Sequence, residues 1–236
     1  MASRLLRRSG IAVALIAELI EWEPDLVVQV GIGHFWKEVE VMQEAWPRVK
    51  FVGFEPHPDI FLEANKTYPG ELVCCALGEK PENRQLWYVD AFREGASLYS
   101  GKGIERSVEV QVIRMDGTSV AFTSYGKKIL YWIDCEGSEL SVLKGSVEFL
   151  NKVDVINIEL TGNPPRPGWP SPVGVNRWLL DHGFVSQYIH THRCSSGQND
   201  MVYVKPHLFR PEFCSCPLQV EDYFRRYGSV ASRENE

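Results

Sequence analysis

Short apolar runs alternate along the chain with longer segments in which apolar residues recur every three or four positions. The short runs are rich in β-branched and aromatic residues, as is typical of strands buried on both faces. They occupy residues 26–30, 50–54, 72–77, 129–133 and 153–158. The helix-like segments occupy residues 37–46, 58–66 and 138–150. This alternation predicts a parallel sheet that is covered by helices on both faces.

Two parts of the chain depart from this alternation. Residues 85–89 and 107–112 are extended runs joined by a loop that contains Gly and Ser, which predicts a small hairpin insertion. Residues 184–190 and 201–205 read as strands on either side of a polar turn, and so short a connection predicts antiparallel pairing. The expected fold is therefore α/β, with a mostly parallel, doubly wound sheet and an antiparallel last strand.

The first 24 residues place three arginines before the apolar run 11–17, as a secretory signal does. However, the run ends at Glu18, no small-residue cleavage site follows, and its apolar residues have helical spacing. We therefore expect residues 1–24 to form an amphipathic helix packed on the domain, with a signal as the alternative. Residues 25–210 are expected to form the main domain, and residues 211–236 a C-terminal extension.

Composition narrows the classes of function. The 236 residues are 44% hydrophobic and 24% charged, and no segment approaches the apolar length that a membrane span needs. Lys and Arg number 25 against 31 Asp and Glu, so the net charge is -6 and no overall basic field attracts a nucleic acid. We expect a cytoplasmic protein that acts on neither nucleic acid nor membrane; the oligomeric state stays open.

The six cysteines do not have the density of a disulfide scaffold, so reduced thiols are expected. His190, His192 and Cys194 would share one face of an extended strand, with Cys214 and Cys216 nearby, which leaves a zinc site as an alternative. Their spacing matches none of the common zinc patterns. No metal is therefore expected.

A glycine-containing loop, Gly31-Ile32-Gly33-His34, follows the first predicted strand. Glycines let the backbone turn sharply and approach a ligand, and a helix follows, so the loop is typical of a nucleotide-cofactor site. A dinucleotide fingerprint would have a third glycine where Trp36 stands, which disfavours NAD. The amides of this turn are expected to bind the carboxylate of an S-adenosylmethionine molecule.

Two further strand ends contribute to the same predicted edge. Glu55-Pro56 follows the second strand, where an ionised acid can accept hydrogen bonds from both ribose hydroxyls. We expect Glu55 to lie on a solvent-facing strand end. Ala76 and Leu77 end the third strand and can leave room for the flat edge of an adenine.

Asp134 and Glu136 emerge at the end of the fourth predicted strand, where open α/β sheets bind ligands. The stretch from Asp134 to Gly145 fits the pattern Asp-x-Glu-Gly-x-Glu followed by Leu-x-x-Leu-Lys-Gly. With Glu55-Pro56 and the later Ile158-Glu159-Leu160, it resembles the FkbM-type methyltransferases over residues 25–205. The resemblance implies a Rossmann-like class I methyltransferase fold, S-adenosylmethionine as methyl donor, and a hydroxyl on a sugar, glycan or small metabolite as acceptor.

The first motif departs from the family pattern Asp-Val-Gly-Ala-Asn-x-Gly. Gln29 replaces the aspartate, and Ile32 and Gly33 replace the alanine and asparagine. Gln29 can still hydrogen-bond the methionine ammonium, but it carries no negative charge. A cofactor-binding protein without turnover is therefore one alternative, and a nicotinamide-dependent oxidoreductase is a second.

Methyl transfer to a hydroxyl needs a group that aligns the acceptor oxygen and removes its proton. Asp134 is the first candidate, followed by Glu136, Glu159 and His190. The Pro-rich loop at residues 163–172 follows the fifth strand and is expected to overhang the acceptor. The residues that we expect to bind the acceptor are Arg166 and Trp169, with His192.

Overall fold

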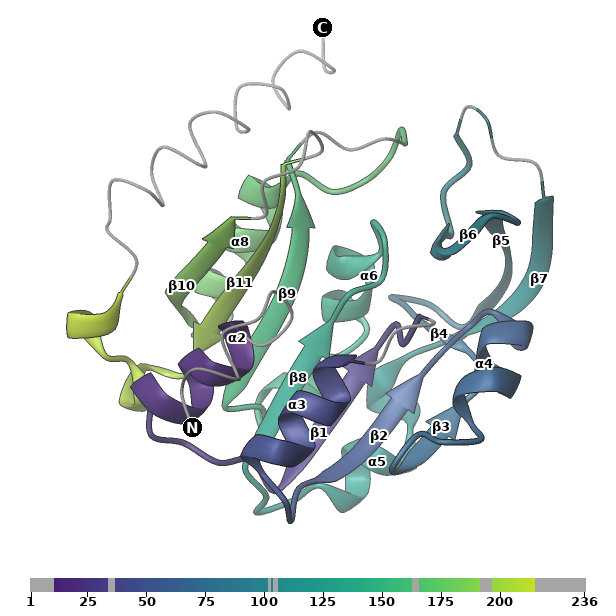
Figure 1. Ribbon diagram of the computed structural model, residues 1–236. Helices are drawn as coiled ribbons and strands as arrows, with labels where there is room; N and C mark the ends of the chain where they lie inside the picture. The colour runs from purple at the N-terminus through teal and green to yellow at the C-terminus, as the bar shows by residue number, and fades with distance from the viewer. Residues whose placement is uncertain are drawn as a thin grey trace, which may run out of the picture.

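The computed structural model describes residues 11–33, 37–101, 103, 106–162, 166–191 and 197–214. Its centre is a seven-stranded sheet in the order β10-β11-β9-β8-β1-β2-β3 (Figure 1). The parallel strands are β1 (Leu26–Val30), β2 (Lys50–Phe54), β3 (Glu71–Val73), β8 (Ile129–Ile133) and β9 (Val155–Thr161). The last strand, β11 (Gln198–Val204), lies between β9 and β10 (Val185–Thr191) and is antiparallel to both. The predicted α/β architecture with an antiparallel last strand is confirmed.

Helices cover both faces of this sheet, and β1 and β8, which are apolar except for Gln29, are buried along their whole length. One face packs against α2 (Ile11–Ala14), η1 (Leu15–Leu19), α3 (Lys37–Ala45) and α4 (Pro58–Ala64). The opposite face packs against α5 (Ser119–Thr123), α6 (Glu139–Lys144), α7 (Val147–Leu150) and α8 (Pro172–Asp181). Single-turn 3-10 helices lie at Met115–Gly117, Pro206–Leu208 and Pro211–Phe213. Within the described part of the chain, no helix is long and apolar enough to cross a membrane.

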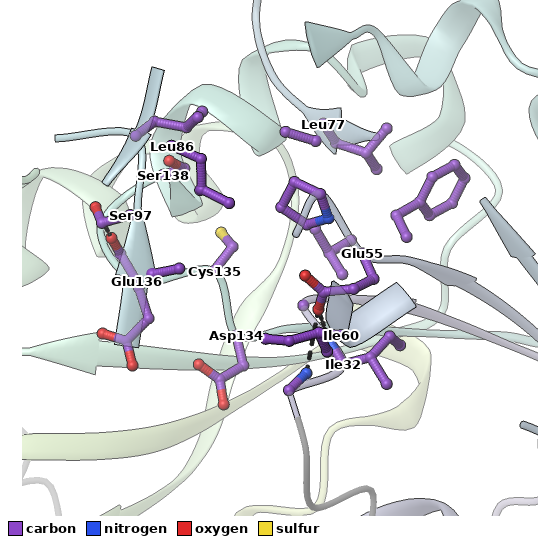
Figure 2. A pocket seen from close by; sticks show the side chains of 18 of the residues that line it. Ile32, Glu55, Ile60, Leu77, Leu86, Ser97, Asp134, Cys135, Glu136 and Ser138 are labelled. Atoms are coloured by element: carbon purple, nitrogen blue, oxygen red, sulfur yellow. Dashed lines mark hydrogen bonds between the residues drawn. The ribbon is translucent and has the colours of Figure 1, made fainter. Parts of the chain in front are cut away.

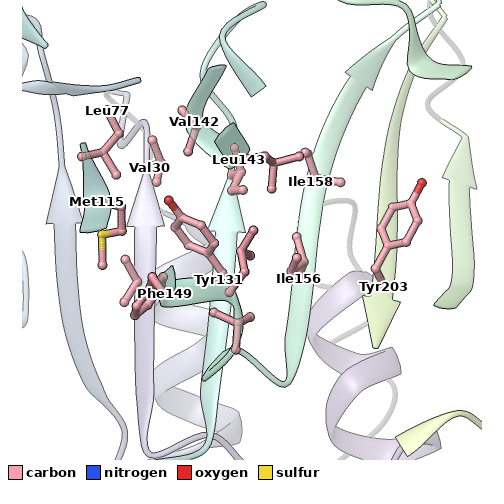
Figure 3. Packing of buried hydrophobic residues seen from close by; sticks show 14 of the residues in the cluster. Val30, Leu77, Met115, Tyr131, Val142, Leu143, Phe149, Ile156, Ile158 and Tyr203 are labelled. Carbon is pink, nitrogen blue, oxygen red and sulfur yellow. The ribbon is translucent and has the colours of Figure 1, made fainter. Parts of the chain in front are cut away.

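The single helix predicted over residues 138–150 is wrong, because the chain breaks between α6 and α7. A Cβ atom at Gly145 would lie 2.0 Å from the carbonyl oxygen of Gly78, so the chain passes too close there for any side chain. The Ser146 hydroxyl then lies 3.1 Å from the Tyr131 hydroxyl in the core, where the Tyr131 ring meets Phe149 edge to face (Figure 3). These contacts fix the break that helical periodicity alone does not reveal.

The single strand predicted over residues 72–77 is also wrong. It divides into β3 and β4 (Ala76–Leu77), and β4 joins a second, four-stranded sheet in the order β4-β7-β5-β6. The predicted hairpin is present as β5 (Glu82–Val89) and β7 (Arg106–Ile113), which pair antiparallel. β6 (Phe92–Ser97) was not predicted, because Phe-Arg-Glu-Gly-Ala-Ser lacks the alternation of a strand. This second sheet brings side chains to the carboxyl edge of the first.

Candidate active site

The carboxyl ends of four parallel strands are tied together by backbone hydrogen bonds. The amide of Gly31 donates to the carbonyl of Phe54 at 2.9 Å, and the amide of Asp134 donates to the carbonyl of Val30 at 2.9 Å. The amide of Glu55 donates to Val73 at 3.0 Å. The loops after β1, β2 and β8 therefore keep a fixed relation at the edge where open α/β sheets bind ligands.

A pocket opens between these loops and the second sheet (Figure 2). Most of the cofactor-binding residues that the sequence predicted line it: Gly31, Gly33, Glu55, Pro56, Ala76, Leu77 and Asp134. Gln29 does not line it. Its buried side chain lies within the sheet, where the amide oxygen accepts a hydrogen bond from the Tyr68 hydroxyl at 3.3 Å. His34 lies outside the described residues.

Glu55 organises the loop that follows β1. One of its carboxylate oxygens accepts hydrogen bonds from the amides of Ile32 at 3.1 Å and Gly33 at 3.2 Å. The other accepts the amide of His57 at 2.8 Å. Glu55 is 4% exposed, so the predicted solvent-facing position is wrong, because these backbone donors hold the carboxylate inward. The same bonds engage the loop amides that were expected to bind the methionine carboxylate.

A glycine is needed at position 31 because the loops after β1 and β8 pass very close to each other there. Its φ of +81° lies in the left-handed region that favours glycine. A Cβ atom here would lie 1.7 Å from the backbone carbonyl oxygen of Asp134. Gly31 thus allows the loop after β1 to pack against the loop that carries the candidate catalytic acids.

Three predicted catalytic carboxylates meet at one end of this pocket. Oxygens of Asp134, Glu136 and Glu159 all lie within 4.8 Å of one another, close enough for a cation to bind between them. Desolvation by the surrounding chain, with the charges of Glu159 and Glu136, raises the pKa of Asp134, although part of its side chain stays open to solvent. Mutual repulsion makes full ionisation of the cluster unfavourable, so a proton is held there more readily than by an isolated carboxylate.

Glu136 has an unusual backbone, with a φ of +48°. Desolvation and the charge of Glu139 raise its pKa from 4.5 to about 7, while the Arg166 charge opposes the shift. Glu139 is buried, and its carboxylate accepts the amide of Gly137 at 2.9 Å. A carboxylate that titrates near neutral pH suits general base catalysis.

Arg166 is held by backbone carbonyls of the second sheet and the turn that follows it. Its guanidinium donates to the carbonyls of Gly95 at 2.7 Å, Tyr99 at 3.0 Å and Trp87 at 3.4 Å. These contacts favour an anchor between the Pro-rich loop and the second sheet over the predicted role in binding an acceptor.

Trp169 lies directly on the backbone that follows Glu136. A Cβ atom at Gly137 would be 2.3 Å from the indole nitrogen, and Gly137 has a φ of +97°. The half-buried indole therefore packs on Gly137, the residue that follows Glu136. The side chains of His190, His192, Cys194 and Cys216 lie outside the described residues, and Cys214 is a free thiol.

Sequence reasoning missed one wall of the pocket. The second sheet and the turn after it supply Leu86, Phe92, Arg93, Ala96, Ser97 and Leu98, and α3 and α4 supply Glu38 and Ile60. Ser138, at the start of α6, is also on the wall. The only sequence signal for this wall was the predicted hairpin, whose position relative to the main sheet depends on long-range contacts.

Solved structures with a similar arrangement are distant relatives in sequence. Magnesium protoporphyrin IX methyltransferase from Synechocystis PCC 6803, with bound SAM, is 11% identical with a TM-score of 0.48, covering 82% of this chain and 76% of that one. Fibrillarin from Aeropyrum pernix, with bound S-adenosyl-L-methionine, is 13% identical with a TM-score of 0.47, covering 82% and 74%.

The sequence itself carries a more specific likeness. Among curated proteins, no sequence matches this chain. The family model of the methyltransferase FkbM domain matches residues 33–186. That range contains the carboxylate cluster, Glu55 and the second sheet. Since the match spans more than half of the chain, the protein belongs to the FkbM family of methyltransferases.

Proposed function

We propose that the protein transfers a methyl group from S-adenosylmethionine to a hydroxyl of a neutral acceptor, such as a sugar, glycan or small metabolite. One observation carries the proposal: Asp134 lies both on the wall of the pocket and within the carboxylate cluster. A donor in the pocket and a proton acceptor are thereby brought to one place, as methyl transfer to oxygen requires.

The pocket residues fit the donor part by part. The Glu55 carboxylate lies on the wall of the pocket at the end of β2, where an acid can accept hydrogen bonds from ribose hydroxyls. Ala76, Leu77, Leu86 and Leu98 form an apolar end suited to a purine. When bound, S-adenosylmethionine supplies an activated methyl group on a sulfonium. The acidic residues near Asp134 favour that positive charge.

The carboxylates also limit the acceptor. Asp134, Glu136 and Glu159 would repel a phosphate or carboxylate on the acceptor, and the Arg166 guanidinium is engaged by backbone carbonyls. A neutral polyol can donate hydrogen bonds to these oxygens. Asp134 then orients the acceptor hydroxyl and takes its proton, with Glu136 as the second candidate because its pKa is raised to about 7.

The test has two steps. Isothermal titration with S-adenosylmethionine, S-adenosylhomocysteine and NAD should show binding of the first two alone. A screen with radiolabelled donor should then label hydroxylated acceptors. NAD binding without S-adenosylmethionine binding would support an oxidoreductase and contradict the proposal. Donor binding with label appearing only on amines, or with no transfer to any acceptor, would contradict the hydroxyl assignment.

A further inference from the structure

Ser138 carries a buried hydroxyl that forms no hydrogen bond within the described residues. The residue is 4% exposed, and its Oγ atom has no partner. It occupies the N-cap position of α6, where a serine side chain usually accepts a hydrogen bond from a backbone amide of the first turn. Here the side chain makes no such bond.

The groups around Ser138 are already engaged. The Glu139 carboxylate accepts the amide of Gly137 at 2.9 Å. The Ser138 amide donates to the carbonyl of Cys135 at 3.3 Å, and the Ser138 carbonyl accepts the amide of Val142 at 2.9 Å. The backbone of Ser138 is therefore satisfied, and only its hydroxyl lacks a partner.

Ser138 is one of the residues that line the pocket. Figure 2 places Ser138 on the same side as Leu86 and Ser97, across the pocket from Glu55. The Ser97 hydroxyl is engaged, because it donates to the carbonyl of Glu136 at 2.6 Å and accepts the amide of Tyr99 at 3.2 Å. Ser138 thus offers hydrogen-bonding capacity in a region of mainly apolar side chains.

We propose that the Ser138 hydroxyl hydrogen-bonds the edge of the donor's purine and so selects an adenine nucleoside. This inference rests on the proposed function, since it requires the donor to lie with its ribose at Glu55. The purine then extends towards Leu86 and Leu98, where its ring nitrogens and exocyclic amine need a polar partner. A serine hydroxyl both donates and accepts, so it can satisfy either kind of group.

The unliganded protein gives the first test. An unpaired buried hydroxyl costs free energy, so Ser138→Ala should leave the melting temperature unchanged or raise it. A structural serine would behave in the opposite way, and a clear fall in melting temperature would contradict the proposal. Ser107→Ala, on the exposed side of β7, is the matched control and should change neither melting temperature nor binding.

Binding of donor fragments gives the second test, by titration calorimetry on the full chain. Ser138→Ala should weaken S-adenosylhomocysteine and 5′-methylthioadenosine by the same factor, about three- to tenfold, because both contain the purine. S-ribosylhomocysteine, which lacks the purine, should bind the variant and the parent equally. Deaza and deamino analogues of S-adenosylhomocysteine each lack one polar group of the purine. The analogue that lacks the group bound by Ser138 should bind Ser138→Ala and the parent protein with equal affinity.

The outcomes separate this inference from the proposed function. If the parent protein does not bind S-adenosylhomocysteine, the proposed function itself fails. If the parent binds it and Ser138→Ala binds both purine ligands equally well, the proposed function stands and the role of Ser138 is overturned. An equal loss for S-ribosylhomocysteine would also overturn it, because the effect would then not involve the purine.

Discussion

The two ends of the pocket are built in opposite ways. The end that we propose for the donor contains apolar side chains, with Leu77, Leu86 and Leu98 buried. The end that we propose for the acceptor gathers carboxylates whose pKa values are raised by desolvation and by neighbouring acids. Packing stabilises the first end, whereas the second lowers stability when its acids ionise. Such a cost is typical of groups that a reaction requires.

Asp134→Asn should produce the largest effect, because it removes the proposed base. The amide cannot take the acceptor proton, so we expect kcat to fall by about 10²- to 10⁴-fold. Affinity for S-adenosylhomocysteine should change little, since the apolar end and Glu55 are untouched. Steady-state kinetics and titration calorimetry measure the two quantities separately.

Two controls sharpen this result. Glu159→Gln removes a neighbouring charge and should reduce kcat less than Asp134→Asn. Assays with EDTA and with added Mg²⁺ distinguish a carboxylate that acts as a base from one that binds a cation. Activity that EDTA abolishes and Mg²⁺ restores would contradict the role of Asp134 as the base.

Glu55→Ala should have the next largest effect and act at the donor end. It removes a charged acceptor for two ribose hydroxyls, which corresponds to a rise of on the order of 100-fold in the Kd of S-adenosylhomocysteine. It also leaves the amides of Ile32, Gly33 and His57 without their partner, so some loss of stability is expected. Glu55→Gln keeps the shape and should weaken binding less. Unchanged affinity in a folded Glu55→Ala variant would show that this carboxylate serves only the loop.

The donor end could be predicted only in part. Gly31 and Glu55 follow strands whose apolar runs are plain in the sequence, and parallel strands bring their carboxyl ends to one edge. Leu77, Leu86 and Leu98 reach the same pocket through a second sheet. Their position depends on the pairing of β4 with β7, which no local pattern encodes.

The carboxylate cluster could also be predicted only in part from the sequence. Motif spacing located Asp134 and Glu136, and the structure brings Glu159 beside them from β9. The roles of Gln29 and Arg166 could not be derived from their residue types. Their partners, Tyr68 and the carbonyls of residues 87, 95 and 99, are far away in the sequence. Long-range contacts decide whether a polar side chain faces a ligand or the protein itself.

Glu136→Gln should change the pH dependence of stability. The pKa of Glu136 is raised from 4.5 to about 7, so between these values the unfolded chain loses a proton that the folded chain keeps. This group therefore contributes stability at pH below 4.5 that is lost as pH rises to about 7. The neutral amide has no such loss. We expect the variant to be more stable than the parent by about 1–2 kcal/mol at pH 8, and similar to it at pH 4.5.

Urea denaturation at a series of pH values measures this difference. Leu62→Gln, an exposed substitution on α4, is a control that should change stability equally at every pH. A Glu136→Gln curve parallel to that of the parent would show that Glu136 has the same pKa in the folded and the unfolded state.

Trp169→Ala should give the smallest effect and tests whether the indole belongs to the acceptor end. The ring lies on Gly137, beside Glu136, and offers an apolar face to a sugar or macrocycle. Losing one stacking contact should raise the KM for acceptor by about three- to tenfold, while donor affinity stays unchanged.

Two variants serve as controls. Trp169→Phe keeps an aromatic ring and should recover most of the acceptor affinity. Phe122→Ala removes an exposed aromatic side chain on α5 and should have no effect. A fall in donor affinity with acceptor kinetics intact would instead assign Trp169 to the support of the loop after β8, and the acceptor would have to approach from another side of the carboxylate cluster.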